Sequence, residues 1–319
     1  MAKYRIGVDL GGTSIKVGIF SGNGELLGKK NSATDPFCRS WREVVADMAG
    51  LIEGLFRENG AVEADCHSIG VGTPGLIDSR KGTVVYASNF NWERVPILEE
   101  LKRRFDLPMA LANDADCAVL GETVAGAAKG AKNKNVVMFT LGTGVGGGVV
   151  LDGRLSGGGP GKMELGHTII VAGGEPCRCG ILGCLEAYAS ATALIRDASR
   201  AAEDDRDSKM WELCGGELSN MNGRIPFDAM RAGDKTAKRV VENYIGYLGV
   251  GVANAINIWR PDIILLGGGI ANEGDGLILP LTERVRANVF AGDRGCLPII
   301  KRATMGNDAG LYGAAALNV

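Results

Sequence analysis

Residues 7–20 read GVDLGGTSIKVGIF, two alternating apolar and polar segments on either side of a Gly11-Gly12-Thr13 turn. This alternation predicts two antiparallel strands joined by a glycine turn. A third strand is expected around GELLGKK. A helix should follow over WREVVADMAGLIEGLFRENG, because apolar residues recur there about every 3.6 positions. Further along, SIGVGTPG and LPMALAND predict strands, and ILEELKRRFD predicts a short helix.

Residues 135–155, NVVMFTLGTGVGGGVVLDGRL, repeat the plan of strand, glycine turn with threonine, and strand. A long helix should follow Asp234 as N-cap and end before Pro261. DIILLGGG reads as a buried strand, and NDAGLYGAAALNV as a closing helix. The order βββ-α-β-α-β-α, met twice, predicts an α/β protein with two domains and mixed sheets.

The bulk composition narrows the class of protein. The chain has 319 residues, 45% apolar residues and a net charge of -2, which leaves no basic surplus for nucleic acid or anionic membranes. Its apolar runs are too short to span a bilayer, and MAKYRIGVDL enters a strand without a signal peptide. Cys38, Cys66 and Cys117 are scattered among apolar residues, as reduced core thiols would be. We expect a cytoplasmic protein with no nucleic-acid or membrane partner.

The glycine turns predict contact with phosphate. Gly142, Gly144 and Gly147 match G-x-G-x-x-G, but a strand follows instead of a helix, which excludes a dinucleotide fold. No Gly-Lys-Ser/Thr follows either cluster, which excludes a P-loop. Two hairpins that present backbone N–H groups could hold the phosphates of one nucleotide. Two ordinary glycine-rich β-turns remain the alternative.

Several motifs together resemble one family. GVDLGGTSIKVGIF and FTLGTGVGGGVVLDGRL resemble the two phosphate motifs of the actin–hexokinase–heat-shock ATPase superfamily, and ILLGGGIA resembles its adenosine motif. The run CRCGILGCLE closely resembles the CxCGxxGCxE signature of ROK sugar kinases, and GTPGLID and ELGH fit the same family. GCLEAYASAT and GNDAGLYGAAAL are most similar to its bacterial glucokinases.

The resemblance implies two ribonuclease H-like (actin-like ATPase) domains with mixed five-stranded sheets flanked by helices, and an active site in the interdomain cleft. We expect a small domain at 1–113 plus 304–319 and a large domain at 114–303. Domain closure over the sugar should exclude water. We also expect a homodimer or homotetramer.

The same resemblance assigns the nucleotide site. Asp9 would lie near Mg²⁺, which it would reach through water. The residues implied at the phosphates and the adenosine of ATP are Gly11, Gly12, Thr13, Gly142, Thr143, Gly144, Gly268 and Gly269. Lys16 could steer phosphate, but we read it as a solvated strand residue and leave it outside the site.

The catalytic base is sought among carboxylates at a strand end, since phosphoryl transfer needs a group to accept the hydroxyl proton. LPMALAND presents Asn113 and Asp114 there, although both types are also preferred helix N-caps. The resemblance implies that Asp114 is the base for the 6-hydroxyl and Asn113 a sugar ligand. Asp116 is expected on another face of the helix. An ordinary carboxyl pKa near ~4 would suffice for this base.

Further sugar contacts are implied by matched motifs. The resemblance places Gly75, Asn89, Glu164, His167 and Glu186 at the hexose. Glu186 is also a residue type that helix starts favour. Lys162-Met163 before ELGH, and Ser88 before Asn89, depart from the family pattern, which leaves the identity of the hexose open.

One histidine and three cysteines form a compact motif between residues 166 and 186: His167, Cys177, Cys179 and Cys184. Three thiolates and one imidazole suit tetrahedral Zn²⁺ and fill its coordination sphere, which predicts a structural zinc and no metal-bound water. A disulfide is disfavoured in the cytoplasm, and Cys-x-Cys is a poor redox pair. Free thiols remain the alternative.

The resulting hypothesis is an ATP-dependent hexokinase of the ROK type that converts glucose to glucose 6-phosphate, with ATP, Mg²⁺ and structural Zn²⁺. N-acetylglucosamine, N-acetylmannosamine, fructose, mannose or allose are alternative substrates. A sugar-sensing regulator should carry a helix-turn-helix before its first strand, but only eight residues precede Asp9. A chaperone-type ATPase would need a substrate domain for which the chain has no room.

Overall fold

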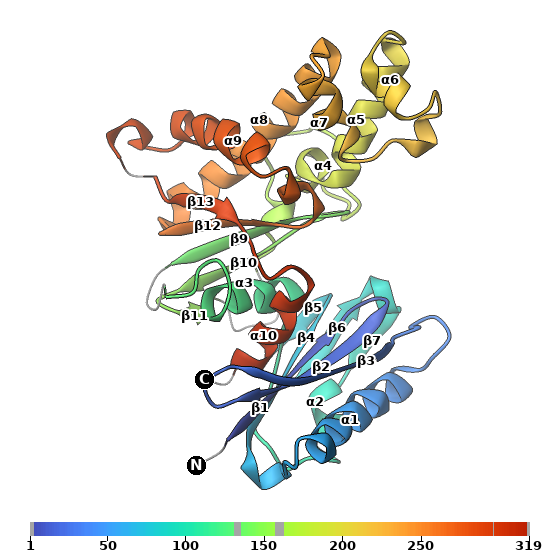
Figure 1. Cartoon of the computed structure of the whole chain (residues 1–319), viewed down its shortest axis with the longest axis vertical. Coiled ribbons are helices and arrows are strands. Elements are labelled where there is room, and N and C mark those ends of the chain that lie inside the picture. Colours follow the sequence, from blue (N-terminus) through green and yellow to red (C-terminus); the bar gives the residue numbers. More distant parts are fainter. Residues whose placement is uncertain (1–2, 131–134, 157–162, 296, 318–319) are drawn as a thin grey trace. The chain divides into compact units, whose positions relative to one another are not determined.

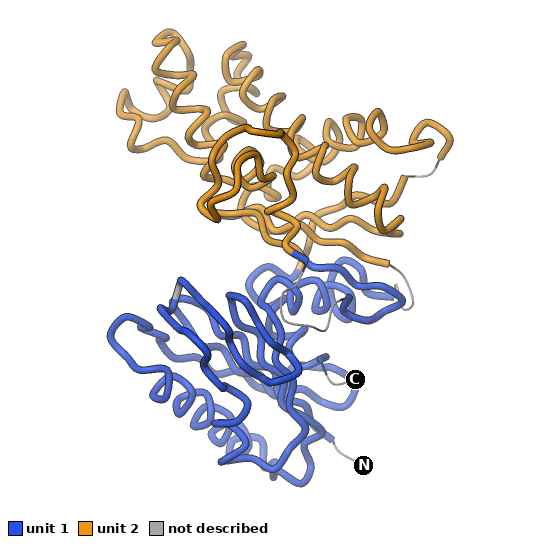
Figure 2. The backbone as a smooth tube through the Cα atoms, turned by 180° about the vertical axis from the view of Figure 1, so that it is seen from behind, with its two compact units in different colours: residues 1–133, 148–163, 305–319 blue, residues 134–147, 164–304 orange. Residues whose placement is uncertain are grey.

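The structure of the protein is a computed structural model that describes residues 3–130, 135–156, 163–295 and 297–317. The chain forms two compact units (Figure 2). Unit 1 contains Met1–Asn133, Gly148–Met163 and Met305–Val319, and unit 2 contains Lys134–Gly147 and Glu164–Thr304. Lys162 and the glycine-rich run at 157–161 lie outside the described residues.

Unit 1 is built on a mixed five-stranded sheet of order β3-β2-β1-β4-β8 (Figure 1). Strands β1, β2 and β3 are antiparallel, whereas β1-β4 and β4-β8 are parallel. The strands are β1 (Tyr4–Leu10), β2 (Ser14–Ser21), β3 (Leu26–Ala33), β4 (Cys66–Thr73) and β8 (Met109–Asn113). The helices are α1 (Trp41–Glu58), α2 (Ile97–Leu101), α3 (Asp114–Val124) and α10 (Ala309–Ala316), with 3-10 turns η1 (Glu63–Asp65), η2 (Ser88–Phe90) and η7 (Gly306–Asp308).

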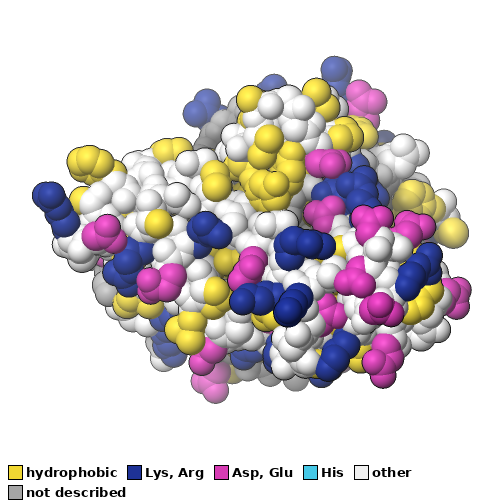
Figure 3. Space-filling model, turned by 90° about the horizontal axis from the view of Figure 1, so that it is seen from above, with side chains coloured by type: hydrophobic (Ala, Val, Ile, Leu, Met, Phe, Trp, Pro, Cys, Tyr) yellow, Lys and Arg dark blue, Asp and Glu magenta, His cyan; other side chains and the backbone are white. Residues whose placement is uncertain are grey.

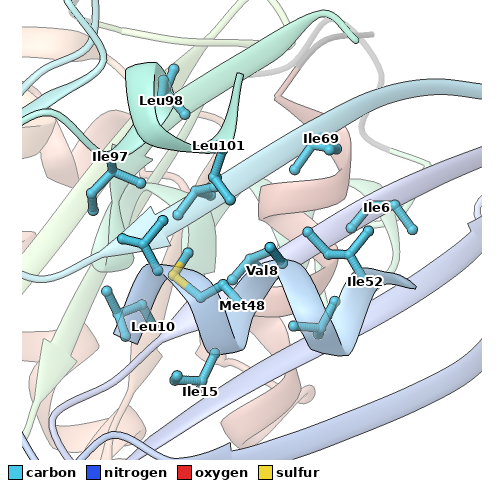
Figure 4. Close-up of a cluster of buried hydrophobic side chains, with 14 of the residues drawn as sticks. Ile6, Val8, Leu10, Ile15, Met48, Ile52, Ile69, Ile97, Leu98 and Leu101 are labelled. Carbon is cyan, nitrogen blue, oxygen red and sulfur yellow. The ribbon is translucent and has the colours of Figure 1, made fainter. Parts of the chain in front are cut away.

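Helix α1 shows how the sequence pattern becomes a core. Ser40 and Glu43 form a reciprocal capping box at its start. The apolar positions then fall on one side, and Met48 and Ile52 lie among Ile6 and Val8 of β1 (Figure 4). Each fully buried side chain of this size contributes about 1.5–3 kcal/mol. The periodicity in the sequence therefore predicted this helix correctly.

Helix α10 covers the opposite face of the same sheet, and its backbone lies very close to the backbone of β4. Side chains alternate along a strand, so Gly70 of β4 faces away from the cluster that contains Ile69. A Cβ at Gly70 would lie 1.8 Å from the carbonyl oxygen of Ala314 in α10. Glycine is therefore required where this helix backbone meets the sheet.

The structure assigns α3 differently from the sequence-based boundary at 113/114. Helix α3 belongs to unit 1, because it packs backbone to backbone against α10. A Cβ at Gly313 of α10 would lie 1.7 Å from the carbonyl oxygen of Cys117 in α3. This contact joins residues that are far apart in the chain, so the local sequence pattern does not predict it.

A small antiparallel sheet of order β5-β6-β7 also belongs to unit 1, and the sequence analysis missed it. Its strands are short: β5 (Leu76–Asp78), β6 (Thr83–Ala87) and β7 (Trp92–Val95). Three- to five-residue strands carry too little alternation to stand out from loops. This sheet matters because two of the expected sugar ligands, Gly75 and Asn89, flank its strands.

The second mixed sheet is five-stranded, as the resemblance implied, and has the order β11-β10-β9-β12-β13. The boundary between the units falls within β10, after Gly147. The strands are β9 (Val136–Leu141), β10 (Val145–Leu151), β11 (Arg154–Leu155), β12 (Ile263–Gly267) and β13 (Ile299–Arg302).

The helices of unit 2 include the long α8, which starts at the predicted N-cap Asp234. Asp234 accepts a hydrogen bond from the N–H of Ala237 at 2.7 Å. The helices are α4 (Glu186–Ala189), α5 (Ala191–Asp204), α6 (Lys209–Leu213), α7 (Ile225–Arg231), α8 (Lys235–Trp259) and α9 (Asp275–Asn288). The 3-10 turns are η3 (Leu165–His167), η4 (Leu218–Asn220), η5 (Gly269–Glu273) and η6 (Gly292–Arg294).

Candidate active site

The β1-β2 turn at Gly11-Gly12-Thr13 is held by backbone and side-chain bonds. The N–H of Gly11 donates to the carbonyl of Ser14 at 2.9 Å. Thr34, beyond β3, donates from its hydroxyl to the carbonyl of Gly11 at 2.7 Å and from its N–H to the carbonyl of Thr13 at 3.1 Å. Gly12 and Thr13 stay exposed, so the tip of a rigid turn is free to meet a ligand.

Asp9 and Lys16 face each other at the base of this turn. They are direct cross-strand partners in the β1-β2 register, and Nζ of Lys16 lies 3.1 Å from Oδ2 of Asp9. The same ammonium donates to the carbonyl of Asn307 at 2.9 Å. The Lys16 side chain is 23% exposed, so the expectation of a merely solvated residue is wrong.

The pairing of Asp9 with Lys16 can be read from the pattern of the sequence around the turn. A strand, a Gly-Gly-Thr turn and a second strand bring positions before and after the turn opposite each other, and opposite charges there attract. Gly310 in α10 also approaches Asp9, since a Cβ on that glycine would lie 3.0 Å from Oδ1 of Asp9. Asp9 is thus fixed by β2 and by the start of α10.

Asn113 and Asp114 stand at the junction of β8 and α3. Asn113 is the helix N-cap, and its Oδ1 accepts from the N–H of Ala115 at 2.9 Å. Its Nδ2 donates to the carbonyl of Gly75 at 3.1 Å. Oδ1 of Asp114 also accepts from the N–H of Ala115, at 2.9 Å. Asn113 and Asp114 can therefore stabilise the helix start and also serve in a site, because each uses one side-chain oxygen to accept the hydrogen bond from Ala115.

The electrostatics of Asp114 differ from the sequence expectation of an ordinary carboxyl group. Burial raises the pKa of the Asp114 carboxyl above its usual value. The hydrogen bond from Ala115 opposes this shift, and the negative charges of Asp9 and Asp116 reinforce it. A raised pKa makes the carboxylate a better proton acceptor than a fully solvated aspartate.

Gly75 and Asn89 lie around the small sheet. Gly75 has a φ of +103°, and a Cβ there would lie 2.4 Å from the carbonyl of Tyr86. Only glycine fits this position, and its carbonyl is the one that receives Asn113. The backbone of Asn89 lies in η2, next to Ser88. Two expected sugar ligands, Gly75 and Asn113, are thus in direct contact.

In unit 2, the expected phosphate turn at Gly142-Thr143-Gly144 is tied to the segment at the start of α5. The N–H of Gly142 donates to the carbonyl of Gly144 at 3.0 Å and closes the turn. The N–H of Ala191 donates to the carbonyl of Gly142 at 2.8 Å, and the hydroxyl of Thr192 donates to the carbonyl of Thr143 at 2.7 Å. Neither Ala191 nor Thr192 is among the site residues predicted from the sequence.

Gly268 and Gly269 follow β12, beside the end of β9. Gly268 has a φ of +84°, and a Cβ there would lie 2.3 Å from the carbonyl of Leu141. Gly269 has open space around its Cα and begins η5. The expected adenosine motif and the expected phosphate turn therefore meet at the ends of paired strands, as the parallel β9-β12 register requires.

His167, Cys177, Cys179 and Cys184 gather into one cluster. One ligand atom of each lies within 4.8 Å of all the others. The sulfurs of Cys179 and Cys184 are 3.7 Å apart, and Nδ1 of His167 lies 3.7 Å from the sulfur of Cys177. Tetrahedral zinc with Zn–S bonds of about 2.3 Å separates two sulfurs by about 3.8 Å, so these donors fit the ion.

The thiols of this cluster differ in their surroundings. Burial raises the pKa of the Cys177 thiol to about 12 and also raises the pKa of Cys184. A hydrogen bond from the backbone of Ile181 lowers the pKa of Cys179. Thiols that burial keeps protonated need a cation to become thiolates, and a metal supplies that charge.

Glu164 and Glu186, the two expected acidic sugar ligands, have different environments. Glu164 precedes η3 and is exposed. Glu186 begins α4 and is half-buried, and its Oε2 accepts from the N–H of Val145 at 3.0 Å. Its Oε1 lies 3.5 Å from the sulfur of Cys177. The start of α4 therefore contacts both the Cys/His cluster and the β9-β10 hairpin.

On the face shown in Figure 3, basic and acidic side chains are interspersed, with apolar side chains gathered between them. Among the described residues, no helix combines the length and apolar character needed to cross a bilayer.

Comparison with known proteins places this arrangement in one family. The ROK family profile matches residues 5–319. A glucokinase of Thermotoga maritima is 37% identical over 314 residues, which is 98% of this chain and 96% of the relative. The crystal structure of a ROK hexokinase from Thermus thermophilus is 35% identical with a TM-score of 0.82, covering 99% of this chain and 97% of the other.

The chain is also similar to a ROK family glucokinase whose crystal structure contains glucose and AMPPNP. The ROK family glucokinase from Streptomyces griseus, solved with glucose and AMPPNP, is 30% identical with a TM-score of 0.77, and 98% of each chain is covered. The fold therefore agrees with the expected actin-like ATPase architecture. With a match over nearly its whole length, the chain belongs to the ROK family.

Proposed function

We propose that this protein is an ATP-dependent glucokinase that transfers the γ-phosphoryl group of ATP to the 6-hydroxyl of glucose. The observation that carries the proposal is the half-buried Asp114, the first residue of α3, with a raised pKa, beside an Asn113 that is hydrogen-bonded to Gly75. Relatives named glucokinase that match almost the full chain support the choice of sugar and donor.

Asp114 is the proposed base. The 6-hydroxyl oxygen attacks the γ-phosphorus, the bond between that phosphorus and the β–γ bridging oxygen breaks, and ADP leaves. The hydroxyl proton passes to the Asp114 carboxylate. Its Oδ1 is already held by the Ala115 N–H, which orients the group and leaves the other oxygen for the proton.

The sugar contacts are proposed residue by residue, with each unit taken by itself. In unit 1, Asn113 and Gly75 form one bonded pair, and Asn89 lies in η2 of the same unit. In unit 2 the proposed ligands are Glu164, His167 and Glu186. His167 belongs to the four-residue cluster, and Oε1 of Glu186 lies 3.5 Å from the sulfur of Cys177. Carboxylates accept hydrogen bonds from hydroxyls, and amides both donate and accept, so this set can distinguish the hydroxyls of a hexose.

Zinc is proposed at the four-residue cluster, where it would serve as a tetrahedral anchor with no open position. Nδ1 of His167 lies 3.7 Å from the sulfur of Cys177. With the metal bound to Nδ1, Nε2 would be the ring nitrogen that carries a proton. That N–H can donate to a sugar hydroxyl. The cluster would thereby hold a hydrogen-bond donor in one orientation.

The nucleotide residues are the two glycine turns and the glycines after β12. Mg²⁺, when bound with ATP, neutralises charge on the β- and γ-phosphates. Asp9 fits a role beside this ion as a single carboxylate, because Mg²⁺ keeps several of its waters. A cytoplasmic location, where ATP is present and thiols stay reduced, suits this proposal.

A second candidate substrate is another hexose. Met163 stands directly before Glu164, and Ser88 directly before Asn89, where the family pattern differs. Both neighbour a proposed sugar ligand, so they could reshape the pocket around one hydroxyl.

The deciding experiment is a coupled kinase assay on the wild-type protein. Glucose, mannose, fructose, allose, N-acetylglucosamine and N-acetylmannosamine would be compared at equal ATP and Mg²⁺. The proposal expects the highest kcat/KM with glucose. A higher value with any other sugar would transfer the assignment to that hexose, and no turnover with any of them would refute it.

A further inference from the structure

One residue connects the Cys/His cluster to the β9-β10 hairpin, and this connection bears on how the binding of one substrate affects the affinity for the other. Glu186 is the residue that touches both. Its Oε1 lies 3.5 Å from the sulfur of Cys177, and its Oε2 accepts from the N–H of Val145 at 3.0 Å. Val145 is the first residue of β10, directly after the phosphate turn.

The carboxylate of Glu186 also lies very close to Gly144 of the turn. A Cβ at Gly144 would lie 2.2 Å from Oε2 of Glu186. Glycine at this position is therefore explained by Glu186 itself, because any side chain would displace the carboxylate. The hydrogen bond to Val145 is charge-assisted, and such bonds are stronger than neutral ones.

Two further bonds join the same segment to the same turn. Ala191 donates from its N–H to the carbonyl of Gly142, and Thr192 donates from its hydroxyl to the carbonyl of Thr143. Together with Glu186, these residues contact all four consecutive positions of the turn, from Gly142 to Val145. The orientation of the turn thus depends on the segment from Glu186 to Thr192.

This segment is itself anchored to α8. The hydroxyl of the buried Tyr244 donates to the carbonyl of Ala189 at 2.9 Å. Leu185, directly before α4, is fully buried and packs on Gly251, where a Cβ would lie 2.5 Å from its side chain. The contacts with α8 therefore hold the backbone next to Glu186 in place. A movement of the Glu186 side chain would change the position of the turn at residues 142–145.

We propose that Glu186 is a positioning residue for the nucleotide turn in addition to its role at the sugar, and that it couples the binding of the two substrates. The inference rests on the proposed function for the identity of those substrates. A sugar hydroxyl that binds Glu186 would fix the carboxylate that orients the turn. By linkage, glucose must then tighten nucleotide binding by the same factor by which nucleotide tightens glucose.

The test measures nucleotide affinity in the zinc-loaded, full-length protein without sugar, by calorimetry with a non-hydrolysable ATP analogue, and then repeats it with glucose. The wild type should bind the analogue at least about fivefold more tightly with glucose present. Glu186→Ala should bind it about tenfold more weakly than the wild type even without sugar, since a charged acceptor is lost. Its response to glucose should disappear.

Matched variants separate positioning from a general structural effect. Glu186→Gln keeps an acceptor for the Val145 N–H, so its sugar-free nucleotide affinity should stay within about threefold of the wild type while glucose binding weakens. Glu164→Gln, which changes an exposed residue that is proposed as a sugar ligand only, should weaken glucose binding and leave nucleotide binding as in the wild type. Zinc content measured on each variant should equal that of the wild type.

Thr192→Val provides an independent test at an exposed position that is expected to tolerate substitution. It removes one neutral hydrogen bond to the turn, so sugar-free nucleotide binding should weaken about threefold. Wild-type nucleotide affinity in a folded, zinc-loaded Glu186→Ala would overturn the inference; if that variant does not fold, wild-type affinity in Thr192→Val would do so. A wild-type protein that binds nucleotide but phosphorylates no hexose would refute the proposed function and leave the sugar-free measurements valid.

Discussion

Lys16 Nζ lies 3.1 Å from Asp9 Oδ2 across the first hairpin, so the carboxylate proposed beside Mg²⁺ already has a cationic partner. The pair sits directly below the exposed turn of Gly12 and Thr13. An ammonium in this place would also attract the phosphates of ATP.

Lys16→Met is therefore expected to raise the KM for ATP about tenfold, with a smaller change in kcat, because the lost interaction acts in binding. Lys29→Met is the matched control: Lys29 is on the neighbouring strand β3 and pairs with Asp308. Steady-state kinetics at saturating glucose would check this. An unchanged KM for ATP in Lys16→Met would exclude Lys16 from the site.

Asp114→Ala is expected to keep glucose binding and lose turnover by at least about 100-fold, the usual contribution of a general base. Glucose binding measured by calorimetry separates this from a loss of the sugar site. Substantial residual kinase activity would show that another group takes the proton.

The pH dependence follows from the raised pKa of Asp114. The base must be ionised to work, so the acidic limb of kcat/KM should lie above the usual aspartate range around 3.8. Asp116→Asn removes one of the charges that raise this pKa and should move the limb to lower pH. A limb that stays in place in Asp116→Asn would contradict the electrostatic argument.

Asp114 should also cost the protein stability. Since the folded-state pKa is above the unfolded one, the penalty is present at neutral pH and fades as the pH falls through the folded pKa to below the unfolded value. Asp114→Asn should therefore melt at a higher temperature than the wild type at pH 7, and the difference should shrink toward acidic pH. Thermal melts at several pH values, with Asp106→Asn as a surface control, would check the sign.

Cys177→Ser is expected to reduce the zinc content and raise the KM for glucose, because His167 and the neighbouring glutamates lose their anchor. Cys38→Ser is the control, because Cys38 lies outside the cluster and is exposed, which corrects its expected place among core thiols. Zinc can be quantified by a chelating dye after denaturation. An unchanged metal content in Cys177→Ser would refute the zinc assignment.

Gly70→Ala should destabilise unit 1 by at least about 2 kcal/mol, since the added methyl group would overlap the backbone of α10 at Ala314. Gly50→Ala, within α1, meets no neighbouring atom within 4 Å and should stabilise by about 0.5–1 kcal/mol. Denaturant unfolding of both variants would test this contrast. Equal effects would mean that α10 does not seat tightly on β4.

The local sequence pattern was sufficient to predict the secondary-structure elements that contain much of the proposed site. The alternation in residues 7–20 and its repeat in residues 135–155 predicted both hairpins, and the apolar period of α1 predicted that helix. Strands, helices and tight turns depend on the periodicity of apolar residues and on the residue types at the turn. Both are properties of residues that are close together in the sequence. The compact spacing of His167, Cys177, Cys179 and Cys184 also predicted a cluster, because a short loop can bring its own ligands together.

The tertiary structure alone decided how these pieces act on one another. It placed α3 with α10, joined Gly75 to Asn113, and set Glu186 against the turn before Val145. It also raised the pKa of Asp114, which sequence reasoning had left ordinary. The sequence determined which residues are present and which local elements they form. Burial and long-range contacts arise only when distant segments pack, and they decided the charge, partner and orientation of each group.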